Sequence, residues 1–195
     1  GSMQEDVKRR DFSVNALLYE PLSEQLHDLV GGLADLEKRL LRAVGEPERR
    51  FQEDRLRLLR ALRFAANLEF DIEAETWRAL CAAAPGIQLI SKERIAGELE
   101  KMLCGGHSRR AFELLESSGL LEQILPELAA LRQVAQPPQF HPEGDVWQHT
   151  LLLLQELDLL LPNCSAEAEA PRFSQGRLKR CSELEKRILT WAALL

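Results

Sequence analysis

The 195-residue sequence contains no apolar run approaching the roughly 18 residues that a membrane-spanning helix needs. It also lacks the pattern of a secretory signal peptide at its start, where Gly1-Ser2-Met3 resembles a cloning remnant, so the natural start is expected upstream. Its cysteines are few, and their long, irregular spacings fit neither a disulfide framework nor a zinc site: Cys81, Cys104, Cys164 and Cys181. We therefore expect reduced thiols in a cytoplasmic protein that does not contact a membrane.

The sequence also lacks a positive net charge, which by itself would argue against a nucleic-acid partner. The formal net charge is −6, but residues 37–63 hold nine basic and five acidic side chains, a local charge of +4. The remaining residues therefore carry −10. A basic surface on an acidic protein favours a phosphate-containing ligand that is bound at one place. The apolar content of 45% is ordinary and allows a buried core.

Residues 46–67, EPERRFQEDRLRLLRALRFAAN, predict one continuous helix. Pro47 lies in an acidic first turn, and no helix breaker follows before Asn67. Apolar residues recur at steps of three and four and predict a buried stripe: Leu58, Leu62, Ala65 and Ala66. On another face, four residues recur at steps of four, three and four and should stack in one column: Glu53, Arg57, Arg60 and Phe64.

Asp54 lies on the flank of this column, three residues before Arg57. A carboxylate beside a guanidinium can accept from an amino group and donate to a ring nitrogen. Adenine and cytosine present that pair on their Watson–Crick edges, whereas guanine and uracil present a carbonyl next to an N–H. The helix could therefore read A or C. The alternative is an ordinary ion pair between residues i and i+3 on a solvated helix, worth a few tenths of a kcal/mol.

The other segments predict mainly helices. Near the N-terminus, a strand over 12–19, a turn and a second strand over 26–30 predict a β-hairpin. A short extended piece is expected over 41–44, and a flexible loop over 162–181. Helices are expected over 33–41, 73–84, 92–103 with Ser91 as its cap, 107–118 with Gly119 just past its end, 120–131 with a break at Pro126, 147–161 and 183–195.

Three segments in order, RRDFSVNALLYEP, the stretch from DLVGG to ANLEF, and ISKERIAGELEKML, resemble one family. It comprises the bacterial class II tRNA nucleotidyltransferases, or CCA-adding enzymes, and the poly(A) polymerases. The resemblance is close over about the first 125 residues and less specific over HPEGDVWQHTLLLL. It implies a mostly α protein, a multi-helix neck and body region with a short N-terminal β-hairpin remnant of the nucleotidyltransferase head domain. The expected divisions are head-domain remnant 1–44, nucleotide- and RNA-binding helical neck 45–125, and helical body or truncated HD-like domain 126–195.

The resemblance also implies a function for the intact parent protein. That protein would transfer CMP, AMP or both from CTP or ATP to RNA 3′ ends with Mg²⁺, in tRNA CCA-end maturation or repair. Its partners would be a tRNA or other RNA 3′ end and a nucleoside triphosphate. Two alternatives stay open, namely a non-catalytic helical module that binds RNA or nucleotide, and a truncated HD-type phosphohydrolase.

Site residues follow from the family's motifs. The arginine–aspartate motif would contact ribose and triphosphate, and the aspartate and arginine of E-D-x-x-R would pair with the base. The expected nucleotide-binding residues are Arg10, Asp11, Asn15, Asp54, Arg57 and Arg60. Supporting roles are expected for Arg9, Asp35, Glu53, Glu93 and Arg94. The alternatives are a solvated charge cluster before the hairpin, a helix N-cap region around Asp35, and structural ion pairs for Glu93 and Arg94.

One family element is absent from the sequence. The family's transfer reaction uses two aspartates on a strand, after a Gly-Ser segment, to hold two metal ions. This sequence has no Gly-Ser followed by Asp-x-Asp, and only ten residues precede Asp11. We therefore expect no catalytic residue, no complete metal site and no activity of this chain alone. His149 resembles one HD-domain ligand, but a single imidazole is no metal site, so a structural or solvated role is expected.

Overall fold

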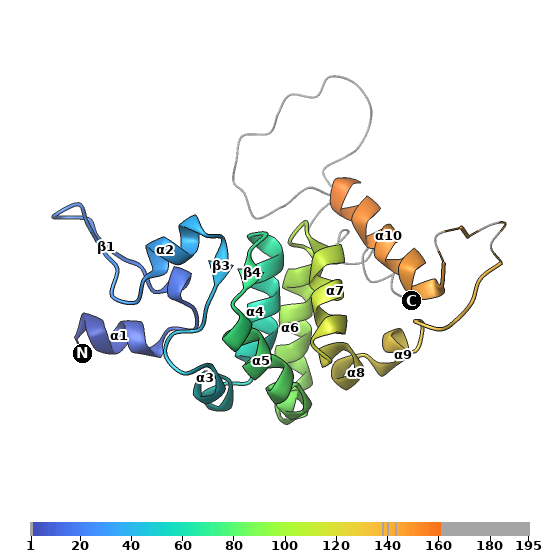
Figure 1. Ribbon diagram of the computed structural model, residues 1–195, viewed down its shortest axis with the longest axis horizontal. Helices are drawn as coiled ribbons and strands as arrows, with labels where there is room; N and C mark the ends of the chain where they lie inside the picture. Colours follow the sequence, from blue (N-terminus) through green and yellow to red (C-terminus); the bar gives the residue numbers. More distant parts are fainter. Residues whose placement is uncertain (1, 138, 140, 143, 161–195) are drawn as a thin grey trace, which may run out of the picture.

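The structure is a computed structural model that describes residues 2–160 except 138, 140 and 143. The chain runs from a small mixed α/β region at one end to a row of packed helices, with α10 (Val146–Leu160) at the other end (Figure 1). The prediction of a mostly helical protein with an N-terminal hairpin is confirmed. Among the residues described, no helix has the length and apolar character to span a membrane. The predicted segments 162–181 and 183–195 lie outside the described residues.

The N-terminal region contains, in order, α1 (Met3–Arg9), the 3-10 helix η1 (Ser13–Asn15), β1 (Leu18–Glu20), β2 (Gln25–His27), α2 (Gly32–Glu37) and β3 (Leu40–Leu41). The hairpin pairs Tyr19 with Leu26 in antiparallel register. The strand predicted over 12–19 is wrong for residues 13–17, because the chain curls into η1 after Phe12, which is extended and forms an isolated β-bridge with Ala43. Residues 3–9 form a helix, which a capping box between Ser2 and Glu5 begins.

The single helix predicted over residues 46–67 is wrong. The structure divides it into α3 (Pro47–Glu53) and α4 (Leu56–Asn67). Asp54 has an extended backbone, with φ −148° and ψ 103°, and its side chain accepts the N–H of Leu56 at 3.1 Å. A short carboxylate that binds the nearby backbone competes with helical hydrogen bonds, so the chain changes direction at Asp54.

After α4 the chain forms β4 (Asp71–Ile72), α5 (Ala74–Ala83), the 3-10 helix η2 (Ala84–Leu89), α6 (Lys92–Leu103), α7 (Ser108–Ser117), α8 (Leu120–Ile124), α9 (Pro126–Ala129) and α10. The α-helices among these elements match the predicted helices, including the break at Pro126, whereas β4 and η2 were not predicted. Ser91 occupies the N-cap position of α6 but makes no side-chain cap hydrogen bond. The helix predicted over 33–41 ends early, because Arg39 has a φ of +52° and β3 then pairs in parallel with β4.

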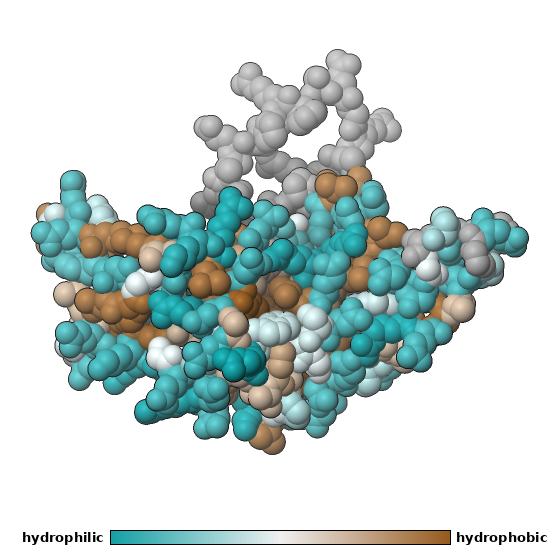
Figure 2. Space-filling view, viewed as in Figure 1, coloured by the Kyte–Doolittle hydropathy of each residue, from teal (hydrophilic) through white to brown (hydrophobic). Residues whose placement is uncertain are grey.

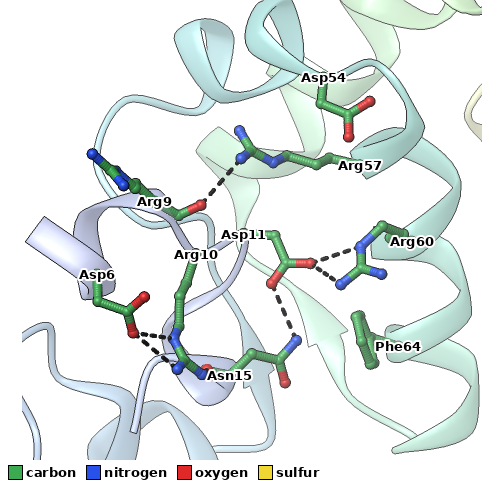
Figure 3. A pocket seen from close by; sticks show the side chains of 9 residues that line it. All are labelled: Asp6, Arg9, Arg10, Asp11, Asn15, Asp54, Arg57, Arg60 and Phe64. Carbon is green, nitrogen blue, oxygen red and sulfur yellow. Dashed lines mark hydrogen bonds and ion pairs between the residues drawn. The ribbon is translucent and has the colours of Figure 1, made fainter. Parts of the chain in front are cut away.

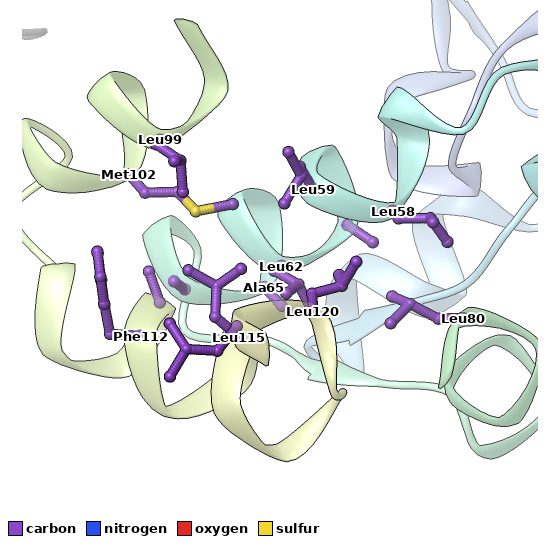
Figure 4. Packing of buried hydrophobic residues seen from close by; sticks show 14 of the residues in the cluster. Leu58, Leu59, Leu62, Ala65, Leu80, Leu99, Met102, Phe112, Leu115 and Leu120 are labelled. Atoms are coloured by element: carbon purple, nitrogen blue, oxygen red, sulfur yellow. The ribbon is translucent and has the colours of Figure 1, made fainter. Parts of the chain in front are cut away.

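The core is built around α4, which packs against α6 and α7 (Figure 4). The predicted stripe is confirmed, since Leu58, Leu62 and Ala65 are completely buried. These side chains meet Met102 of α6 and Leu115 of α7. Each fully buried leucine contributes about 1.5–3 kcal/mol. The burial of one face of α4 directs Arg57 and Arg60 toward the N-terminal region, whereas Arg63 reaches Glu98 of α6.

Candidate functional site

A pocket of about 660 Å³ lies where the N-terminal region meets the α3–α4 junction (Figure 3). Its lining residues are Asp6, Arg9, Arg10, Asp11, Asn15, Asp54, Arg57, Arg60 and Phe64. The structure thus brings together the six residues that the sequence predicted to bind nucleotide, together with Arg9. They come from α1, from the link between α1 and η1, from η1, from the α3–α4 junction and from α4. Hydrophilic residues dominate the face of the molecule shown in Figure 2, with apolar residues in smaller groups between them.

Asp11 and Arg60 form an ion pair at one wall of the pocket. One carboxylate oxygen of Asp11 accepts from Arg60 Nε at 2.8 Å and from its Nη2 at 2.5 Å. The other oxygen accepts from the backbone N–H of Phe12 at 3.0 Å and from Asn15 Nδ2 at 3.3 Å. Because Asp11 is buried, these donors fix the carboxylate in one orientation.

Arg10 forms the adjacent wall. Its guanidinium donates to Asp6 at 3.0 and 3.2 Å and to the carbonyl of Asn15 at 2.8 Å. Sequence reasoning missed Asp6, although its spacing of four residues from Arg10 on a helix was an available signal. The pair is half exposed, so an incoming anion could replace Asp6 as the partner of Arg10.

Asp54 and Arg57 lie next to each other at the third wall, but they are not paired with each other (Figure 3). Asp54 accepts from Arg94 Nη2, which is 3.3 Å from both carboxylate oxygens. Arg57 donates to the carbonyls of Arg50 at 2.9 Å and Arg9 at 3.2 Å, and to Glu53 at 3.1 Å. The i to i+3 ion pair considered from the sequence is therefore replaced by partners from other segments.

Phe64 provides the apolar wall. Its ring packs edge-on against Phe12, with 5.9 Å between ring centroids. The guanidinium carbons of Arg60 and Arg63 lie 5.3 and 4.3 Å from the Phe64 ring centroid. An aromatic ring held in this way can stack with a flat ligand. The sequence placed Phe64 in the helix column, although it was not predicted as a binding residue.

The supporting residues have different positions. Glu53 accepts from Arg49, Arg50 and Arg57. Its bonds with Arg57, and after it Arg50, hold the pKa of Glu53 below its usual value. Arg94 reaches from α6 to Asp54. Arg9 lines the pocket through α1.

Two supporting residues lie away from the pocket. Asp35 is buried and binds Arg42 at 2.7 Å and the Ser13 hydroxyl at 2.5 Å, which anchors α2 to η1. Glu93 lies in the first turn of α6 and does not line the pocket. Hydrogen bonds from its own backbone N–H and from the Ser91 hydroxyl lower the pKa of Glu93.

Over the part of the chain that the structure describes, no group of three His, Cys, Asp or Glu side chains could hold a metal ion. The acidic and histidine side chains in this part of the chain therefore do not fit a two-metal site. His149 packs edge-on against His141, with 5.0 Å between ring centroids.

Sequence models of two protein families match the chain. "Poly A polymerase head domain" matches residues 1–42, and "Probable RNA and SrmB- binding site of polymerase A" matches residues 69–131. The "Multifunctional CCA protein" of Pasteurella multocida is 40% identical over 178 residues, which make up 89% of this chain and 41% of that protein. The chain thus spans about two fifths of the length of this curated relative.

Solved structures are similar as well. The CCA-adding enzyme of Bacillus stearothermophilus in complex with CTP aligns with a TM-score of 0.59 and 42% identity, over 61% of this chain and 30% of that one. A tRNA nucleotidyltransferase with a primer tRNA and an incoming ATP analogue aligns with a TM-score of 0.61 and 30% identity. That alignment covers 80% of this chain and 50% of the other.

Proposed function

The chain belongs to the family of CCA-adding tRNA nucleotidyltransferases and poly(A) polymerases, and we propose that it carries the nucleotide-reading part of such an enzyme. The whole protein would add CMP, AMP or both to RNA 3′ ends, in tRNA CCA-end maturation or repair. The observation that carries this proposal is the pocket that gathers Asp54, Arg57, Asp11 and Arg60 from separate segments.

Base reading would depend on Asp54 and Arg57. Arg57 uses three of its N–H donors within the protein, and a guanidinium has five, so two remain for a ligand. Asp54 accepts from Leu56 and Arg94, which orient its carboxylate and leave acceptor capacity. Asp54 would accept from the exocyclic amine of A or C while Arg57 donates to the adjacent ring nitrogen. Guanine and uracil would leave both protein groups unpaired, at about 1–3 kcal/mol each.

The other walls would bind the rest of the nucleotide. Arg10 and Arg60 would donate to phosphate oxygens, and the fixed carboxylate of Asp11 would accept from a ribose hydroxyl. Phe64 would stack against the base. Asn15, which donates to Asp11 at 3.3 Å, would hold that carboxylate in place.

The remaining proposals concern the whole protein. We take residues 1–44 as part of its head domain, 45–125 as its neck and 126–195 as the start of its body, with tRNA or another RNA 3′ end as partner and the cytoplasm as location. The chain alone would transfer no nucleotide, since its sequence has no Asp-x-Asp pair and the described residues form no cluster of metal ligands.

Nucleotide binding to this chain tests the base-reading proposal without requiring catalysis. ATP, CTP, GTP and UTP are titrated into the wild type and into Asp54→Ala and Arg10→Ala. Asp54→Ala should reduce the preference for ATP over UTP about tenfold, because one discriminating hydrogen bond is lost. Arg10→Ala should weaken all four nucleotides together, because a phosphate contact carries no base information.

Asp71→Ala serves as the control, since it removes an exposed carboxylate outside the pocket. If Asp54→Ala leaves the ratio of ATP to UTP affinity unchanged, Asp54 is part of a scaffold and the proposal fails. Loss of binding to all four nucleotides in Asp71→Ala would show instead that the assay reports stability.

A further inference from the structure

A second pocket, of about 610 Å³, adjoins the first, and Arg9 and Arg57 line both. Five basic residues line it, namely Lys8, Arg9, Arg49, Arg50 and Arg57, against two glutamates. None of its lining residues is aromatic. The pocket therefore offers cationic donors without a surface on which a base could stack, which suits a sugar–phosphate backbone.

The floor of this second pocket is a fixed cationic surface. The guanidinium of Arg50 donates to the carbonyl of Val44 at 2.8 Å, to the carbonyl of Lys8, and to Glu53 at 2.6 Å. Arg50 and Arg57 have side chains that are only 14% and 15% exposed. Both guanidinium groups are thus held in place before any ligand arrives.

The charge at this floor is not balanced within the protein. Three arginines converge on the single carboxylate of Glu53, with Arg49 at 3.3 Å, Arg50 at 2.6 Å and Arg57 at 3.1 Å. Like charges held close together repel one another, so folding alone would favour fewer arginines here. An external anion would relieve that repulsion.

The rim supplies cations that are available to a ligand. Within the described part of the chain, neither the Lys8 ammonium nor the Arg9 guanidinium has a hydrogen-bond or ion-pair partner. Arg49 is 76% exposed and makes one long contact with Glu53. In Figure 3 the guanidinium of Arg9 points away from the Asp11–Arg60 wall, toward the outside of the first pocket.

We propose that the second pocket binds phosphate groups of an RNA strand whose end reaches the nucleotide pocket past Arg9 and Arg57. This inference rests on the proposed function, because it takes the first pocket as the place of the incoming nucleotide. The same phosphate chemistry could come from the polyphosphate tail of that nucleotide. If the phosphates belong to RNA, removing the rim cations lowers the affinity for RNA. If they belong to the nucleotide, it lowers the affinity for ATP and CTP.

The test compares Lys8→Ala/Arg49→Ala with Lys38→Ala/Arg78→Ala. Both double variants lose one lysine and one arginine from exposed positions, and only the first pair lines the second pocket. A fluorescently labelled single-stranded RNA hexamer is titrated at several salt concentrations, and ATP and CTP are titrated separately. Circular dichroism confirms that each variant is folded.

Lys8→Ala/Arg49→Ala should bind RNA about tenfold more weakly than the control at low salt. The slope of log affinity against log salt should fall by about 1.4, since each phosphate contact to a single strand contributes about 0.7. ATP and CTP affinities should stay within about twofold of the control. Equal RNA affinity in the two double variants would overturn the proposal, and so would a loss of ATP affinity as large as that of RNA. Unchanged base preference in Asp54→Ala would instead count against the function proposed for the first pocket.

Discussion

Breaking the buried ion pair between α6 and α4 should be one of the most destabilising single changes in the described part of the chain, because it leaves one charge buried without a partner. Glu98 accepts from Arg63 Nε at 2.8 Å and from Lys101 at 2.7 Å. The side chain of Glu98 is 3% exposed and that of Arg63 14% exposed, whereas Lys101 is largely in solvent. Glu98→Ala would therefore leave the guanidinium of Arg63 without its carboxylate in a mostly dehydrated place, close to the Phe64 ring.

The loss of stability in Glu98→Ala depends on which partner of Glu98 is buried. Removing one member of a buried pair costs about 3–5 kcal/mol, and the lower end applies because Lys101 can return to water. For a chain of this size, each kcal/mol lowers the melting temperature by about 2–4 °C. Glu98→Ala should therefore lower it by about 6–12 °C, measured by thermal unfolding. Glu37→Ala, an exposed glutamate without an ion pair, is the control and should change it by less than about 2 °C.

A double-mutant cycle separates the ion pair from the packing. Arg63→Met combined with Glu98→Leu removes both charges and should recover most of the loss seen in Glu98→Leu alone. Burial raises the pKa of Glu98, but its bonds to Lys101 and Arg63 lower it further, so the folded-state pKa lies below the unfolded one. The stabilisation should be complete above the unfolded pKa and lost as the pH falls through the folded pKa. Additive effects of the two single substitutions on the free energy of unfolding would refute the coupling between Arg63 and Glu98. A difference in the free energy of unfolding between wild type and Glu98→Gln that is the same at pH 7 and pH 3 would refute the predicted pH dependence.

Three further predictions follow. Burial raises the pKa of Asp28, but hydrogen bonds from the backbone N–H groups of residues 30–33 lower it by more, so the pKa lies below its usual value. The ionised Asp28 therefore stabilises the fold, and this stabilisation is lost as the pH falls below about 4. Asp28→Asn should therefore make the free energy of unfolding fall less steeply as the pH drops below about 4. An unchanged dependence of the free energy of unfolding on pH would contradict this role of Asp28. Arg60→Ala should weaken ATP binding at least fivefold, and Arg60→Lys should recover only part, because lysine cannot form the two-atom contact with Asp11. The purified chain with Mg²⁺ should add no nucleotide to tRNA or oligo(A), and template-independent extension would contradict the proposed lack of activity.

Local patterns in the sequence were enough to predict most helices. Apolar residues at steps of three and four identified the buried stripe of α4 and the extents of α6 and α7 within a residue or two. Gly119, with a φ of +77°, ends α7 as predicted. These features depend on contacts within one or two helical turns, which the sequence displays directly. The family could be identified for the same reason, since its motifs are short and contiguous.

Sequence reasoning failed where only the folded chain decides which partner a group takes. The break at Asp54 was missed because a carboxylate can accept either from water or from the Leu56 N–H, and only the fold decides between them. The pairing of Asp54 with Arg94 joins residues 40 positions apart. The strand predicted from Phe12 onward was wrong after its first residue: Phe12 bridges to Ala43, 31 positions away, and residues 13–15 then form η1.

The sequence by itself therefore determined most of the helices, the family and most of the residues that line the first pocket. The tertiary structure decided how those residues are arranged, because Asp11 and Arg60 are 49 residues apart and meet only in the folded chain. It also placed Lys8 and Arg9 next to Arg49 and formed the second pocket. Helical periodicity expresses local geometry, whereas a pocket depends on long-range packing, whose energy is shared among many weak contacts.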